Sequence, residues 1–318
     1  MFDRQFAQVL ETMPAVLATV IQTQGSVPRE VGAKMLICAD GRILGTIGGG
    51  AGEAKVIQQA RAILETGRKQ WVDIDLTGAL HRETQGICGG TMRVWLERWQ
   101  GERSLSLVRQ MMTMLESGQT VSIVTPFDDR SPYLSQDCPE QAFIETLYPA
   151  PTLLIVGAGH CGIQLAKVAD LVGFQVIVQD DRAEWANAEL YPQARVAHCA
   201  IDEVVDELAN HTELYAALVT RGYQYDLAAL KALLNRKLPC RYLGMIGSEK
   251  RVRKVYQTLE IDAEKLRSIY APIGLEIGAL TPEEIAVSIC AELIMVRRGG
   301  TGRSLSERLR TANSSGGR

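Results

Sequence analysis

The chain has 318 residues, of which 46% are apolar and 22% are charged, and its formal net charge is −3. This composition is that of a globular protein, and the length suits about two domains of roughly 150 residues each. The small negative charge gives no electrostatic basis for nucleic acid as the main partner, and no apolar run approaches the roughly 18 residues that span a bilayer.

The first part of the chain, residues 1–128, predicts an α+β domain. Its opening segment has the spacing of an amphipathic helix and lacks the features of a signal peptide, so we expect a cytoplasmic protein. Strand patterns follow, two of them joined by the turn pair Asp40-Gly41. Helical spacing over 51–67 and 104–118 predicts two helices, which we expect on one face of the sheet.

Residues 129–150 contain prolines and acidic residues without sustained periodicity, which predicts a linker, within which 141–149 has the pattern of an edge strand. Residues 151–299 then alternate apolar strands with helices, as in a Rossmann-like domain with a doubly wound parallel sheet. The last helix is predicted to start at Thr281 with a capping box. The tail, 300–318, is rich in glycine and serine and predicts disorder.

A glycine fingerprint, G-x-G-x-x-G, stands between the first strand and the first helix of the second domain. Gly157 permits the tight turn, Gly159 lets a pyrophosphate approach the backbone, and Gly162 allows close packing of helix on strand. Asp180 ends the next strand, where such folds place an acid for a ribose hydroxyl. His160 lies in the first turn of the helix, where it can contact a phosphate. The pattern also fits a Rossmann-like turn that binds no ligand.

Two further segments follow strands of the second domain. In the turn GMIGSEKR we expect Ser248 to cap a helix whose first turn carries Arg251. Because a cation there opposes the helix dipole, a bound anion would explain it, although a plain solvated turn fits as well. The segment RGYQYD places Arg221, Tyr223 and Asp226 near the carboxyl edge of the sheet, without an evident acid–base couple.

The first domain has its own glycine cluster. Gly48, Gly49 and Gly50 precede a helix whose first turn carries Glu53, an acid that suits the helix dipole. Three consecutive glycines cost backbone entropy, so a bent strand end or a closely approaching ligand must justify them. Arg29 is predicted to lie on a rigid turn after Pro28. There it can either bind a phosphate or form one half of a surface ion pair.

The seven cysteines include no CxxC pair, which argues against a clustered zinc or iron–sulfur site, and most are expected to be small buried residues. Cys88 differs because it stands before a Gly-Gly pair at the start of a strand. Two interpretations are open: a small residue at a crowded turn, or a thiol displayed for a soft metal or sulfur.

Together these stretches resemble the XdhC/CoxI family of molybdenum cofactor insertion factors. In the first domain the resemblance rests on GSVPREVGAKMLI, GTIGGGAGEAKVI and ICGG. In the second it rests on LLIVGAGHCGIQLAK, YLGMIGSEKR and APIGLEIGALTPEEIAVSICAELI, so it covers nearly the whole chain apart from the tail. Many members carry histidine where this chain has Tyr223 and Tyr270, so a ligand or metal role of those histidines does not carry over.

The resemblance implies a chaperone rather than an enzyme. Such a protein binds the molybdenum cofactor, as molybdopterin or its cytosine dinucleotide, assists its sulfuration and inserts it into an apo oxidoreductase. The implied partners are the molybdenum-binding subunit of an aldehyde oxidoreductase or xanthine dehydrogenase, a cysteine desulfurase, a molybdopterin cytidylyltransferase and a second copy of the chain. By this resemblance Cys88 contacts molybdenum or its sulfur, with Arg29 and the glycine cluster shaping the pocket.

Two other functions stay open. A NAD(P)-dependent oxidoreductase would use the same fingerprint, although no proton donor stands out beside it. A scaffold would bring a desulfurase and its target together without holding the cofactor. Identifying whatever pterin or nucleotide co-purifies with the protein distinguishes these functions.

Overall fold

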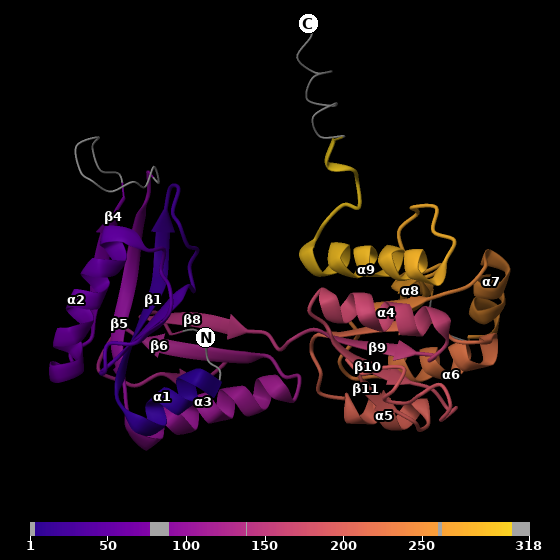
Figure 1. Ribbon diagram of the computed structural model, residues 1–318, viewed down its shortest axis with the longest axis horizontal. Helices are drawn as coiled ribbons and strands as arrows, with labels where there is room; N and C mark the ends of the chain where they lie inside the picture. The colour runs from indigo at the N-terminus through magenta and orange to yellow at the C-terminus, as the bar shows by residue number, and fades with distance from the viewer. Residues whose placement is uncertain (1–3, 77–88, 138, 260–262, 307–318) are drawn as a thin grey trace, which may run out of the picture. The chain divides into compact units, whose positions relative to one another are not determined.

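The computed structural model describes residues 4–76, 89–137, 139–259 and 263–306, which form two compact units (Figure 1). The first unit comprises the chain up to Glu116 together with Thr120–Leu147, and the second comprises Ser117–Gln119 and the chain from Tyr148 onward. None of the helices in the described ranges is long and apolar enough to cross a membrane.

A five-stranded antiparallel sheet forms the centre of the first unit. Its strand order is β3-β2-β1-β5-β4, so β1 lies in the middle. The strands are β1 (Ala15–Gln24), β2 (Lys34–Cys38), β3 (Ile43–Gly45), β4 (Gln70–Asp75) and β5 (Thr91–Trp99). Alternate residues of β1 enter two different hydrophobic clusters, because successive side chains of a strand point to opposite faces of the sheet.

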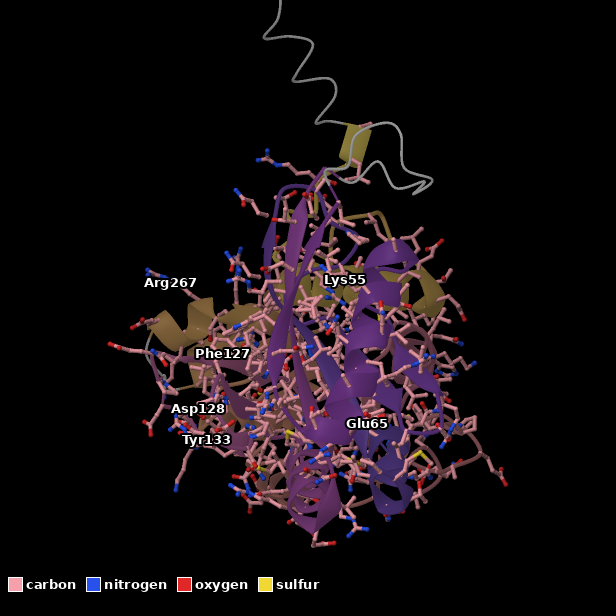
Figure 2. The ribbon with its side chains drawn as sticks, turned by 90° about the vertical axis from the view of Figure 1, so that its left-hand side faces the viewer. Lys55, Glu65, Phe127, Asp128, Tyr133 and Arg267 are labelled. Atoms are coloured by element: carbon pink, nitrogen blue, oxygen red, sulfur yellow. The ribbon has the colours of Figure 1, made fainter. Side chains whose placement is uncertain are left out.

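Helices cover both faces of this sheet. On one face lies α2 (Gly50–Thr66), where Figure 2 shows Lys55 and Glu65 toward its opposite ends. On the other face lie α1 (Arg4–Thr12) and α3 (Gly101–Glu116). The expectation that the helices over 51–67 and 104–118 share one face was therefore wrong. The first six residues of β1 are all buried, and a strand buried on both sides needs a cover on each.

The predicted hairpin is present, but its turn is longer than expected. The Gly41 amide donates to the Cys38 carbonyl at 3.0 Å, and Gly41 is left-handed with φ +88. Asp40 keeps a negative φ, since every left-handed residue among those described is a glycine. The connection is thus a three-residue turn closed by glycine rather than a two-residue type I′ turn, which requires a positive φ at both positions.

Much of the predicted linker belongs to the first unit. A second antiparallel sheet has the order β7-β6-β8, formed by β6 (Val121–Pro126), β7 (Tyr133–Leu134) and β8 (Ala142–Leu147). Phe127, Asp128 and Tyr133, labelled in Figure 2, mark the connection from β6 to β7. The unit reaches Leu147 rather than ending at 128, because β6 pairs with β8 along its whole length. The edge strand expected over 141–149 corresponds to β8.

A six-stranded parallel sheet forms the centre of the second unit, in the order β11-β10-β9-β12-β13-β14. The strands are β9 (Thr152–Val156), β10 (Gln175–Gln179), β11 (Arg195–Ala197), β12 (Leu214–Leu218), β13 (Tyr242–Met245) and β14 (Ile269–Tyr270). All five residues of β9 and of β12 are buried, as in a sheet covered on both faces. This confirms the predicted Rossmann-like, doubly wound architecture.

Helices pack on each face of the parallel sheet. One face carries α4 (His160–Leu171) and α9 (Pro282–Arg298), and the other carries α5 (Ile201–Glu207), α6 (Tyr223–Leu234), α7 (Glu249–Thr258) and the short α8 (Ala263–Arg267). The predicted cap of α9 is confirmed, because the Thr281 hydroxyl accepts from the Glu284 amide at 3.3 Å. The strand order reverses between β9 and β12, and doubly wound folds bind ligands at the carboxyl ends of the strands beside such a reversal.

Candidate functional site

Two loops of the first unit meet at Pro28 and Gly48. Gly48 is left-handed with φ +127, and a Cβ on it would lie 2.3 Å from Pro28 Cγ. Gly49 and Gly50 are also left-handed, with φ +77 and +67, but a Cβ on either would meet nothing within 4 Å. Packing thus requires the first glycine, whereas the backbone path alone requires the other two. The three glycines bend the chain between β3 and α2 and leave an open space beside the last two.

A third loop reaches the same end of the sheet. A Cβ on Gly25 would lie 3.1 Å from the Gly89 carbonyl oxygen, and a Cβ on Gly90 would lie 2.4 Å from the Gln24 carbonyl oxygen. The backbones therefore pack directly on one another where β1 ends and β5 begins. Cys88 lies outside the described residues, so the role of its thiol stays a prediction. Gly89, its neighbour in sequence, belongs to this backbone contact.

The carboxylate of Glu53 accepts hydrogen bonds from the glycine loop. Its Oε2 accepts hydrogen bonds from the Thr46 hydroxyl at 2.7 Å, the Gly49 amide at 3.0 Å and the Ile47 amide at 3.3 Å. Burial acts to raise the pKa of Glu53, but these hydrogen bonds outweigh it and hold that pKa below its ordinary value. The carboxylate therefore stabilises the loop, and its direct contact with a ligand stays a prediction.

Arg29 is an exposed cation of these loops. It forms no hydrogen bond or ion pair with any residue in the described part of the chain. Lys34, by contrast, is 8% exposed, and its Nζ donates to Glu145 Oε1 at 2.6 Å. The amides in the first turn of α2 also lack intrahelical acceptors. An exposed guanidinium and a helix N-terminus in these loops are both suited to an anion.

In the second unit the three fingerprint glycines have distinct geometric roles. Gly157 is left-handed with φ +109, and a Cβ on it would lie 2.7 Å from the Val219 carbonyl oxygen. A Cβ on Gly162 would lie 2.4 Å from the Gly157 carbonyl oxygen, so the start of α4 packs tightly on the loop. Gly159 has an ordinary φ of −75, and a Cβ there would meet nothing within 4 Å. Two glycines thus serve the fold, and the third leaves the backbone open.

Basic and aromatic side chains flank the start of α4. His160, the first residue of the helix, is exposed and contacts Trp185 edge-on, with ring centroids 5.3 Å apart. The Arg182 guanidinium lies 5.4 Å from the centroid of the same Trp185 ring. Both side chains lie close to the open backbone of the fingerprint, where a phosphate would bring negative charge.

Asp180 forms hydrogen bonds with the fingerprint loop and with Arg182. It is 4% exposed, and its carboxylate accepts from the Ala158 amide at 2.8 Å and from Arg182 Nε at 2.9 Å. Burial acts to raise its pKa, but the hydrogen bonds from Arg182 and Ala158 outweigh it and hold the pKa far below the usual range. This carboxylate ties the glycine loop to the end of β10 and also lines the cavity described below, so its contact with a ribose hydroxyl stays a prediction.

A cavity of about 190 Å³ opens at the carboxyl ends of β9, β10 and β12. Arg221 lines it, and its guanidinium donates to both oxygens of Asp181 at 2.6 and 2.9 Å and lies 3.8 Å from the centroid of the Tyr225 ring. The sequence placed Arg221 at this edge but gave no role to Asp181, Cys199 or Tyr225, which also line the cavity. The signal that could have indicated this cavity is Asp181, a second acidic residue directly after Asp180.

The turn before α7 is a structural site. Ser248 caps the helix as expected, accepting from the Arg251 amide at 3.4 Å. The Arg251 guanidinium lies 2.6 Å from the carboxylate of Asp226, which is fully buried, and 2.8 Å from the Thr220 hydroxyl. The buried carboxylate of Asp226 balances the charge of Arg251, so neither a bound anion nor a solvated turn is needed to explain this arginine, and its contact with a ligand stays a prediction.

Comparison with known proteins follows the division into two units. Residues 153–293 match the XdhC Rossmann domain, and residues 10–75 match the XdhC and CoxI family. A protein of Bacillus subtilis, described as a probable subunit of xanthine dehydrogenase, is 30% identical, over 89% of this chain and 93% of its own. The molybdenum cofactor insertion chaperone PaoD of Escherichia coli is 25% identical, over 89% of this chain and 83% of its own.

A solved structure shares the fold over most of this chain. It is described as a xanthine dehydrogenase from Bacillus halodurans, and it superposes with a TM-score of 0.67 at 25% identity over 93% of this chain and 96% of that chain. The two family matches include the loop with Pro28, the glycine cluster and the glycine fingerprint. This chain belongs to the XdhC and CoxI family.

Proposed function

We propose that this protein is a molybdenum cofactor chaperone. It binds the cofactor as molybdopterin cytosine dinucleotide, assists its sulfuration and inserts it into an apo enzyme of the aldehyde oxidoreductase or xanthine dehydrogenase type. The observation that carries the proposal is the meeting of three glycine loops at one end of the first unit, through the Pro28–Gly48 and Gly25–Gly90 contacts. The relationship to PaoD supports the choice of cargo.

The chemistry of these loops suits an anionic ligand that carries a soft metal. Exposed Arg29 and the first-turn amides of α2 attract negative charge, while Gly49 and Gly50 let a ligand approach the backbone. Cys88 precedes Gly89 in sequence and supplies a thiolate, which is a ligand for molybdenum or its terminal sulfur.

The cavity of the second unit suits a nucleotide. A pyrophosphate has access to the backbone at Gly159 and to His160, and the nucleoside fits the space beside Arg221 and Tyr225. Both carboxylates line the cavity and accept hydrogen bonds, but the Asp180 side chain is 3% exposed and the Asp181 side chain is 50% exposed, so we assign Asp181 to a sugar hydroxyl. We propose that this cavity binds the nucleotide end of the cargo.

The exchange of the cofactor requires partners, which we propose by family relationship. They are the molybdenum-binding subunit that receives the cofactor, a cysteine desulfurase that supplies the terminal sulfur and a cytidylyltransferase that makes the dinucleotide. We place these encounters in the cytoplasm.

The test is to purify the protein from cells that make the cofactor, release whatever is bound and identify it by mass spectrometry. We expect a pterin dinucleotide in the wild type, a strongly reduced amount in Cys88→Ala, and an unchanged amount in Cys38→Ala, whose thiol is buried in the core of the first unit. Equal retention in both variants removes Cys88 from the site. A released nicotinamide dinucleotide would favour an oxidoreductase, and binding of the desulfurase that persists in cofactor-free cells would favour a scaffold.

A further inference from the structure

The last helix carries an exposed stripe that combines apolar and charged side chains. The α9 stripe consists of Glu283, Val287, Ala291, Ile294 and Arg298, which lie on one face of the helix at steps of three or four residues. Val287 is 50% exposed and Ile294 is 39% exposed. The opposite side of α9 packs on α4, which lies beside it in Figure 1, and on the sheet.

The stripe is complementary to itself when it is reversed. Glu283 and Arg298 lie at equal distances in sequence from the point midway between residues 290 and 291, and so do Val287 and Ile294. Two such helices packed antiparallel about that point bring Glu283 of each copy to Arg298 of the other, and Val287 of each to Ile294 of the other. Neither Glu283 nor Arg298 forms an ion pair with a residue in the described part of the chain.

Other features favour this arrangement. Ala291 lies near the centre of the stripe, and a small residue there lets two helix backbones approach closely. Antiparallel packing also places the positive end of each helix dipole beside the negative end of the other. Leu280, 86% exposed, and Ile277, 54% exposed, lie in the segment before α9 and enlarge the apolar surface.

We propose that α9 is the surface through which two copies of this chain pair about a two-fold axis. A closed pair of this type uses the same patch on both copies, which is the property that the reversed charge pattern supplies. The resemblance already implied a second copy of the chain, and the new element is the surface assigned to it; the proposal does not rest on the chaperone function, because it concerns only the outward face of α9.

The test uses charge reversal with the full chain. Glu283→Arg and Arg298→Glu each place like charges opposite one another in the antiparallel pair, so each variant alone is expected to raise the dimer dissociation constant at least about tenfold. Mixing the two variants restores both opposite-charge contacts and is expected to restore dimers. The matched control is Lys250→Glu, an exposed reversal on α7, which is expected to leave the dissociation constant unchanged.

The mixture also separates pairing from helix damage. Both reversals oppose the helix dipole, and each chain keeps its unfavourable charge in the mixture, so recovery there cannot come from a repaired helix. The measurement is molar mass by light scattering across a concentration series, against the chain mass of 34.9 kDa. A wild-type protein that stays monomeric overturns the proposal. The α9 stripe would then contact another part of the same chain or a different protein. Dimers that survive Glu283→Arg and Arg298→Glu, or that do not return in the mixture, overturn it as well.

Discussion

Replacement of Gly159 by alanine separates ligand binding from folding. Gly159 has a φ of −75, which any residue adopts, and its added Cβ would meet nothing within 4 Å. As the N-cap of α4, alanine is somewhat less favourable than glycine, while the smaller conformational entropy of the unfolded chain returns about 0.4–1 kcal/mol. We therefore expect the free energy of unfolding of Gly159→Ala to stay within about 1 kcal/mol of the wild type.

The other two fingerprint glycines are the matched comparison. In Gly157→Ala the left-handed φ of +109 adds strain of about 1–2 kcal/mol. The Cβ, 2.7 Å from the Val219 carbonyl oxygen, adds an overpacking cost of about 1–3 kcal/mol. In Gly162→Ala the Cβ would lie 2.4 Å from the Gly157 carbonyl oxygen, so an overpacking cost of about 1–3 kcal/mol is expected there too. Both of these variants lose stability.

The measurements are urea unfolding and the amount of cofactor that co-purifies per chain. The new methyl group of Gly159→Ala occupies the space that a pyrophosphate would enter, so we expect at least about a tenfold loss of affinity with nearly unchanged stability. A Gly159→Ala protein that is stable and retains a full complement of cofactor would refute the assignment of the fingerprint to the cargo. A Gly159→Ala protein as unstable as Gly157→Ala would refute the geometric argument itself.

Three further variants test individual charges. Glu53→Gln should destabilise the first unit by about 1–2 kcal/mol at neutral pH. Because the pKa of Glu53 is lowered in the folded state, the difference in stability between variant and wild type should vanish as the pH falls through that pKa. Urea unfolding at several pH values measures this difference. Arg251→Met should lower the free energy of unfolding by about 3–5 kcal/mol at pH 7, since it leaves Asp226 buried without its cation. Because burial raises the pKa of Asp226, this loss of stability should shrink as the pH falls and the carboxylate is protonated. The control is Lys250→Met, a change at an exposed residue that should alter stability little. Arg221→Met should weaken nucleotide retention more than stability, and equal retention would exclude it from the site.

The features that the sequence predicted correctly are those that depend on neighbours along the chain. The capping box at Thr281 is formed by residues three positions apart, and the hairpin at Asp40 depends on a turn of adjacent residues. The fingerprint from Gly157 to Gly162 is likewise local, and the continuous apolar strands around it predicted the parallel sheet. Local rules are sufficient where the interacting groups lie within one element and its flanking turn.

The features that the sequence did not predict concern partners that are distant in sequence. A bound anion or a solvated turn was considered for Arg251 because a cation in the first turn opposes the helix dipole, whereas the structure pairs it with Asp226 of another helix. The engagement of Asp180 with Arg182 and with the backbone of the fingerprint loop was not predicted, because it depends on side-chain orientation. The covering of both sheet faces by α2 and α3 follows from tertiary packing, which periodicity within one helix does not determine.

Glycines illustrate why a pattern alone cannot separate fold from function. Gly48 and Gly157 are required by a left-handed backbone together with a close neighbour, and Gly162 by a close neighbour alone. Gly159 has neither a positive φ nor any atom within 4 Å of its missing Cβ, and among the described residues the same holds for Gly89. No described contact requires glycine at either position, so close approach of a ligand, as in the proposed function, is one physical reason for it. One such glycine lies in the fingerprint of the second unit and the other follows Cys88, which is where the chemistry of the cargo would place them.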